Sequence, residues 1–83
     1  MSTYRVAYTN EARAGRDVIP AERKKAFDTG IAALAGDPYG CGSAAVRGDA
    51  DRRDASIGSV AFVRYEVSPA VITITVLRVI PTP

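Results

Sequence analysis

Two neighbouring segments with strand-like patterns near the end of the chain constrain its fold more than any other feature. Val60–Val67 alternates apolar and polar residues, and Val71–Val79 is rich in Val, Ile and Thr. Between them, the short Ser68-Pro69-Ala70 segment has the proline and small residues typical of a turn. Alternation with a period of two and β-branched side chains both favour extended strands. The sequence therefore predicts an antiparallel hairpin here.

The alternation also predicts which side of the hairpin is buried. Four apolar residues share one face: Ala61, Val63, Tyr65 and Val67. The other face carries Phe62, Arg64 and Glu66. In the returning strand we expect Ile72, Ile74 and Val76 to point inward. Tyr65 is thus predicted to be a core residue.

The first half of the chain predicts one strand and two helices. Tyr4–Tyr8 alternates and reads as a strand. Thr9 or Asn10 can cap a helix that we expect to be brief, because Gly15 weakens it. A longer helix opens around Pro20 and ends at Gly36-Asp37-Pro38. Its apolar stripe consists of Phe27, Ile31 and Leu34.

The middle of the chain predicts short strands separated by turns. Ala44–Arg47 reads as a strand ended by Gly48, and Asp54–Ile57 as another. Asp49–Arg53 is polar and is predicted to be a turn. Strand, two helices and three to four antiparallel strands together predict an α+β fold, in which the helices cover one face of a sheet as a two-layer sandwich.

Length and composition limit the classes of protein to be considered. At 83 residues the chain fits a single domain, residues 1–83. The net charge of +2 permits a nucleic-acid partner without requiring one. Cys41 is the only cysteine, which fits a reducing cytoplasm and an inert thiol. The longest apolar run, Val71–Ile80, is shorter than the roughly 20 residues of a membrane helix, so we expect no membrane partner.

Six short motifs follow one another along nearly the whole chain. They are Tyr4-Arg5-Val6, Asn10-Glu11-Ala12, Leu34-Ala35-Gly36-Asp37-Pro38-Tyr39, Gly42-Ser43, Val46-Arg47-Gly48 and Val63-Arg64-Tyr65-Glu66-Val67. In this order and spacing they resemble the RelE/ParE superfamily of toxins from type II toxin–antitoxin systems. The resemblance implies a RelE-like fold and a cognate antitoxin that wraps around the protein. It also implies the activity of relatives like RelE, which cut messenger RNA on the ribosome by attack of a 2′-hydroxyl on the adjacent phosphate, without a cofactor.

The resemblance also implies which residues would do this chemistry. The family carries catalytic basic residues on its central strands, and the matching positions here are Arg47 and Arg64, with Arg78 nearby. We expect these three to be catalytic phosphate contacts, since guanidinium binds phosphate bidentately. Further RNA contacts are expected from Arg52, Arg53 and Phe62. An alternative is that the arginines form surface ion pairs with neighbouring acids, among them Asp54 and Glu66.

Departures from the family pattern leave two functions open. Asp54, Ser56 and Phe62 stand where relatives usually carry basic residues, and the sequence contains no His. Arginine stays protonated and cannot accept a proton near neutral pH. The chain is therefore either a ribosome-dependent endoribonuclease that blocks translation, or a non-catalytic relative that binds an antitoxin or inhibits a protein target such as DNA gyrase. A likeness of fold alone is the third reading. The oligomeric state stays open.

Overall fold

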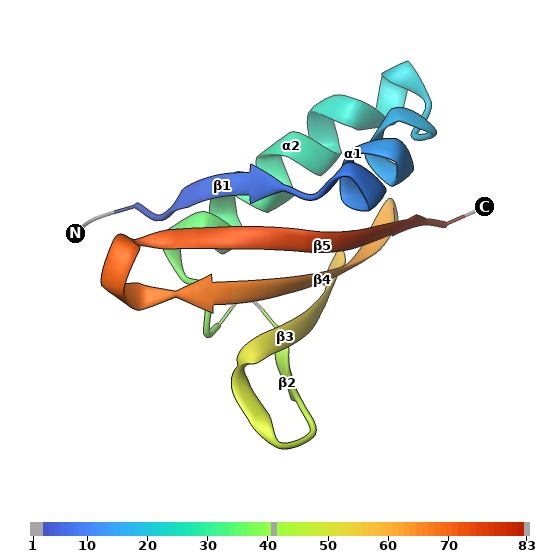
Figure 1. The fold of residues 1–83 in the computed structure, drawn as a ribbon. Coiled ribbons are helices and arrows are strands. Elements are labelled where there is room, and N and C mark those ends of the chain that lie inside the picture. The colour runs from blue at the N-terminus through green and yellow to red at the C-terminus, as the bar shows by residue number, and fades with distance from the viewer. Residues whose placement is uncertain (1–2, 41, 83) are drawn as a thin grey trace.

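The structure, a computed structural model, describes residues 3–40 and 42–82, so Cys41 lies outside the described part. It consists of an N-terminal strand, two helices and four further strands, with a short 3-10 turn (η1) between the last two (Figure 1). In chain order the elements are β1 (Arg5–Tyr8), α1 (Asn10–Asp17), α2 (Ala21–Gly36), β2 (Ala44–Val46), β3 (Asp49–Ile57), β4 (Ala61–Ser68), η1 (Pro69–Val71) and β5 (Thr73–Pro81). Neither helix is long and apolar enough to cross a membrane, as far as the described residues go.

All five strands form one sheet in the order β1-β5-β4-β3-β2. From β2 to β5 the strands are antiparallel and each pairs with the next along the chain. β1 joins the other edge, parallel to β5. The predicted α+β fold, with its N-terminal strand, two helices and antiparallel strands, is confirmed.

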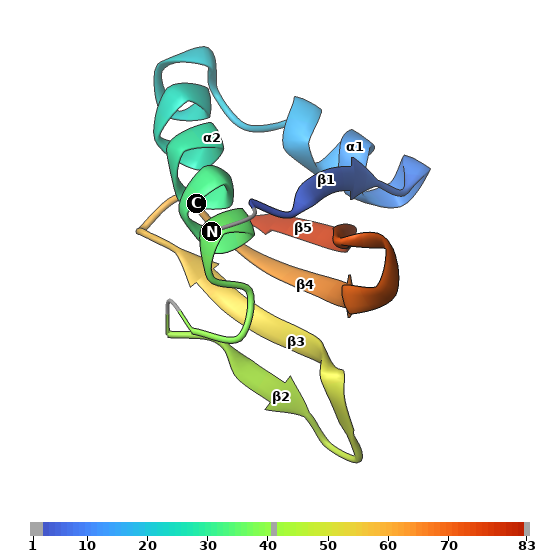
Figure 2. The ribbon, with the colours of Figure 1, turned by 90° about the vertical axis from the view of Figure 1, so that its left-hand side faces the viewer.

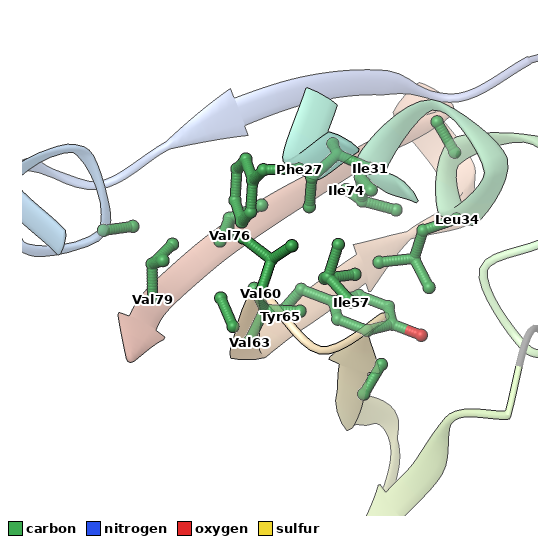
Figure 3. Packing of buried hydrophobic residues seen from close by; sticks show 14 of the residues in the cluster. Phe27, Ile31, Leu34, Ile57, Val60, Val63, Tyr65, Ile74, Val76 and Val79 are labelled. Atoms are coloured by element: carbon green, nitrogen blue, oxygen red, sulfur yellow. The ribbon is translucent and has the colours of Figure 1, made fainter. Parts of the chain in front are cut away.

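Both helices lie on the same side of the sheet, which leaves the opposite face uncovered (Figure 2). The predicted stripe of α2 is buried, since Phe27, Ile31 and Leu34 pack against inward residues of the strands (Figure 3). Tyr65 of β4 lies fully within this core, as predicted, and its hydroxyl donates to the carbonyl oxygen of Pro38 at 2.5 Å. Burial of these aromatic and branched side chains between the layers supplies most of the driving force for folding.

The first helix is brief, as the sequence predicted, with eight residues. Thr9 caps it as expected, with the side-chain oxygen accepting from the backbone N–H of Ala12 at 3.1 Å. The helix then continues through Gly15 to Asp17. Gly15 does not end the helix, although glycine has a low helix propensity. The missing side chain lets α1 approach the Val79 carbonyl of β5, so tertiary packing holds the helix together.

The predicted turn at Asp49–Arg53 is also wrong, because these residues form the first half of β3. They pair with β2 on one side and β4 on the other, where Arg52 lies opposite Glu66. The turn lies earlier, at Arg47 and Gly48, and Gly48 takes a φ of 81° that suits glycine. The polar composition of this segment suggested a turn. It has another cause: the hairpin of β2 and β3 extends beyond the helices, so both of its faces are exposed to solvent (Figure 2).

One inward position of the returning segment was predicted wrongly, just before β5 begins. Ile74 and Val76 are fully buried as expected, whereas Ile72 is 44 % exposed. Ile72 adopts a left-handed conformation with a φ of 48°, because it closes the turn that follows η1. This conformation is unfavourable for a β-branched residue.

Candidate functional site

A groove of about 310 Å³ lies on the uncovered face of the sheet, over the C-terminal parts of β3 and β5 and the first half of β4. It combines a charged part with an apolar part, and one glycine of the loop before β2 contributes to its wall. Its lining residues are Gly42, Asp54, Ala55, Ser56, Phe62, Val63, Arg64, Arg78 and Ile80. Three of the predicted site residues, Phe62, Arg64 and Arg78, therefore come together here.

Arg64 is placed on the uncovered face by the alternation of β4, whose odd-numbered residues fill the core. Asp54 lies directly opposite on β3, and its carboxylate accepts from Arg64 Nε at 2.7 Å and from Nη2 at 3.0 Å. This hydrogen bond lowers the pKa of Asp54, because it favours the ionised carboxylate. About half of each side chain remains exposed, so the pair is accessible from solvent.

Arg78 reaches the same face because β5 carries a β-bulge. Val76 lies opposite Tyr65 and Arg78 lies opposite Arg64, so β5 has one residue more than β4 between these two pairs. The additional residue, Leu77, reverses the alternation and turns Arg78 outward beside Arg64. The guanidinium of Arg78 pairs with Glu11 of α1 at 3.2 Å. No local pattern predicted this partner, which is 67 residues away along the chain.

The apolar part of the groove is a cross-strand pair. Phe62 and Ile80 lie opposite each other on β4 and β5, and their side chains are 54 % and 50 % exposed. The strand alternation predicted the exposure of Phe62. Ile80 was missed, because its orientation depends on the same bulge that reorients Arg78.

The remaining predicted arginines lie outside the groove. Arg52 shares the uncovered face but is further along β3, where it pairs with Glu66 at 3.3 Å. Arg47 is exposed in the turn between β2 and β3, and its side chain forms no ion pair within residues 3–40 and 42–82. Arg53 lies opposite Tyr65 and so belongs to the helix side of the sheet. The five arginines therefore do not share one face, whereas the surface ion pairs considered for Asp54 and Glu66 are present.

Arg53 instead binds the loop that precedes β2. Its Nε donates to Ser43 Oγ at 2.9 Å and its Nη1 donates to the Ala50 carbonyl at 3.0 Å. The same guanidinium lies 5.5 Å from the centre of the Tyr39 ring, whose hydroxyl donates to Asp51 at 2.8 Å. The hydrogen bond to Asp51 raises the pKa of Tyr39 to about 12. We call Tyr39, Ser43, Asp51 and Arg53 the Arg53 cluster; it fixes the loop that contributes Gly42 to the groove.

These side chains suit the binding of a phosphate next to a flat apolar group. Two guanidinium groups on neighbouring strands can each donate two hydrogen bonds to phosphate oxygens. The exposed Phe62 ring offers a surface on which a base can stack. The described residues contain no cluster of three or more His, Cys, Asp or Glu side chains that could hold a metal ion.

Comparison with solved structures places this arrangement among known folds. The chain is similar to the RelBE2 toxin–antitoxin complex from Mycobacterium tuberculosis, with a TM-score of 0.78 and 22 % identity over 95 % of this chain and 91 % of that one. The isolated E. coli RelE toxin also gives 0.78, at 14 % identity over 96 % and 85 %. The fold is that of RelE toxins.

An archaeal RelE–RelB complex from Pyrococcus horikoshii OT3 shares the RelE fold too, with a TM-score of 0.73 and 21 % identity over 96 % of both chains. No family model and no curated protein matches the sequence. The RelE resemblance predicted from the short motifs is thus confirmed at the level of the fold. At these identities the likeness extends no further, and the activity has to be argued from the groove.

Proposed function

We propose that this protein is the toxin of a toxin–antitoxin pair and cuts messenger RNA on the ribosome. The observation that carries the proposal is the pair Arg64 and Arg78, which line one groove beside the exposed Phe62 in a chain with the RelE fold. Cleavage by attack of a 2′-hydroxyl builds negative charge on the phosphate, and guanidinium groups placed around it stabilise that charge.

The individual residues receive different roles in this proposal. Arg64 and Arg78 bind the phosphate at which the chain is cut, and Phe62 stacks on a neighbouring base. Arg52 and Arg47 lie further along β3 and at the tip of its hairpin, where they can contact more distant phosphates. Arg53 is on the other face, so its contribution to RNA binding would be indirect, through the loop it fixes.

The proposal includes a protein partner and a cellular location. Two of the similar structures are complexes of RelE with RelB, which supports an antitoxin as the partner of this chain as well. Such a partner would stabilise the small domain by mass action. Messenger RNA and ribosomes as the target imply action in the cytoplasm.

Replacing Arg64 by Ala tests the assignment of the groove. We expect expression of the variant to leave growth and message intact, because a phosphate contact is lost at the site of cleavage. Arg23→Ala is the matched control, since Arg23 is an exposed arginine of α2 in the other layer. A circular dichroism spectrum and an unfolding curve check that both variants fold. Unchanged toxicity of Arg64→Ala would remove the groove from the mechanism.

One observation favours a second function, that of a non-catalytic binding protein. Both groove arginines are already paired with carboxylates, which lowers their availability for RNA. Purified protein added to a translation reaction with ribosomes separates the two functions. Cut message supports the nuclease. Intact message with arrested growth indicates a protein target such as DNA gyrase, and intact message with normal growth indicates a protein that only binds its antitoxin.

A further inference from the structure

RNA cleavage in the groove requires a group that removes the proton of the attacking 2′-hydroxyl. Arg64 and Arg78 are ruled out, because guanidinium stays protonated in proteins. The chain has no His, and the hydroxyl of Ser56 is a poor base at neutral pH. Among the described residues that line the groove, one side chain remains that is an effective proton acceptor: Asp54.

The geometry of Asp54 leaves it free to act. Arg64 Nε and Nη2 each donate to a different oxygen of the carboxylate. Because a carboxylate has about four lone-pair sites, each oxygen keeps one for another partner. The side chain of Asp54 is 52 % exposed, so a hydroxyl group in the groove can reach it. The bidentate contact also holds the carboxylate and the guanidinium in a fixed relative orientation.

We propose that Asp54 is the proton acceptor for the RNA cleavage proposed above, on which this inference rests. The 2′-O–H bond breaks and its proton passes to an oxygen of Asp54, while the 2′ oxygen forms a bond to phosphorus. The bond from phosphorus to the 5′ oxygen breaks, and the leaving oxygen takes a proton from water. The hydroxide formed removes the proton from Asp54. The products are a 2′,3′-cyclic phosphate and a 5′-hydroxyl end, with no net proton taken up by the protein.

The surroundings of Asp54 keep it ionised at neutral pH. Arg64 of β4 faces it directly, with Arg78 of β5 on the next strand. Arg52 and Glu66 lie one step along β3 and β4, and the facing residue on β2 is the uncharged Ala44. The hydrogen bond from Arg64 holds the pKa of Asp54 below its ordinary value. A base of this kind gives a cleavage rate that does not rise between about pH 6 and 9.

The test compares Asp54→Asn with Asp28→Asn in the ribosome-dependent cleavage assay. Asp28 of α2 is the matched control, because it undergoes the same charge change and its carboxylate also accepts from Nε and Nη2 of one arginine, Arg16. Its side chain is 51 % exposed and does not line the groove. Loss of a general base should lower the rate by about 10²–10⁴-fold. We expect Asp54→Asn to lose cleavage while binding RNA as well as the native protein or better, Asp28→Asn to keep cleavage, and Asp54→Glu to recover part of it.

Several results would overturn the inference without touching the proposed function. One is that the native protein cuts message and the Asp54→Asn variant cuts it equally fast or faster. Asp54 would then only compete with the phosphate for binding to Arg64. Another is that the cleavage rate of the native protein rises about tenfold per pH unit between about pH 6 and 9, which indicates hydroxide as the base. This second measurement needs no variant and so does not depend on the folding of Asp54→Asn. Intact message with the native protein would instead refute the nuclease itself, and with it the role of Asp54.

Discussion

Glycine 15 sets the distance between α1 and the sheet. It lies in the second half of α1, where an added Cβ atom would overlap with the backbone carbonyl oxygen of Val79. A backbone carbonyl in a paired strand cannot move aside as a flexible side chain can. The close approach therefore depends on the absence of a side chain, which the helix propensity of glycine alone does not reveal.

We expect Gly15→Ala to destabilise the protein, although alanine is the better helix former. Propensity favours alanine by about 1 kcal/mol, whereas overpacking against β5 costs about 1–3 kcal/mol and moves α1 outward. Gly36→Ala is the control, since Gly36 also lies in a helix but an added Cβ would meet no atom within 4 Å. Denaturant unfolding measures both. A Gly15→Ala variant as stable as the native protein would show that α1 adjusts freely.

At the scale of elements, the hairpin of β2 and β3 shows where sequence patterns stop being informative. Strands that bury one face were predictable, because Val60–Val67 alternates apolar and polar residues. The first half of β3 has exposed residues on both faces and therefore no alternation to detect. Its strand conformation depends on pairing with its neighbours and on the Arg53 cluster, which are tertiary contacts.

The bulge in β5 likewise limited what sequence patterns could predict about the site. Simple alternation from Ile74 and Val76 would turn Arg78 inward. The bulge at Leu77 turns it outward instead, together with Ile80. Phe62 and Arg64 were thus predictable from the pattern of β4, and Arg78 was inferred only from its closeness to Arg64. The part played by Ile80 could not be predicted from strand periodicity.

Arg53 should hold the hairpin and its loop as one unit, and Arg53→Lys tests this. Lysine keeps the charge but cannot reproduce the planar fork that binds Ser43 and Ala50 together. We expect faster hydrogen exchange of the amides in β2 and the first half of β3, with a loss of about 1–2 kcal/mol in the local opening free energy. Amides of α2 should be unaffected. Arg47→Lys, in the turn of the same hairpin, is the control; equal exchange in both variants would refute the role of Arg53.

At the scale of the whole molecule, the two faces of the sheet have separate tasks. One face packs on the helices and carries the core, which the apolar periodicities of α2 and β4 largely predict. The other carries the groove, in which charges are nearly balanced because each arginine lies beside a carboxylate. Sequence patterns predict the layers well and the ion pairs poorly, since cross-strand partners depend on register.

This balance predicts a weak dependence of RNA affinity on salt. Each phosphate contact of a single strand contributes about −0.7 to the slope of log affinity against log salt concentration, so the two contacts made by Arg64 and Arg78 contribute about −1.4. If phosphate displaces Asp54 or Glu11, the freed carboxylate binds a cation again and the slope becomes shallower. Fluorescence anisotropy with a short single-stranded RNA at several salt concentrations measures it. We expect Arg64→Ala with Arg78→Ala to make the slope shallower by up to about 1.4, which leaves any contribution of Arg52 and Arg47, and Arg23→Ala to leave it unchanged. If the slope of the native protein is steeper than about −3 and the double variant keeps it, RNA binds another surface. Basic side chains outside the groove would then dominate binding.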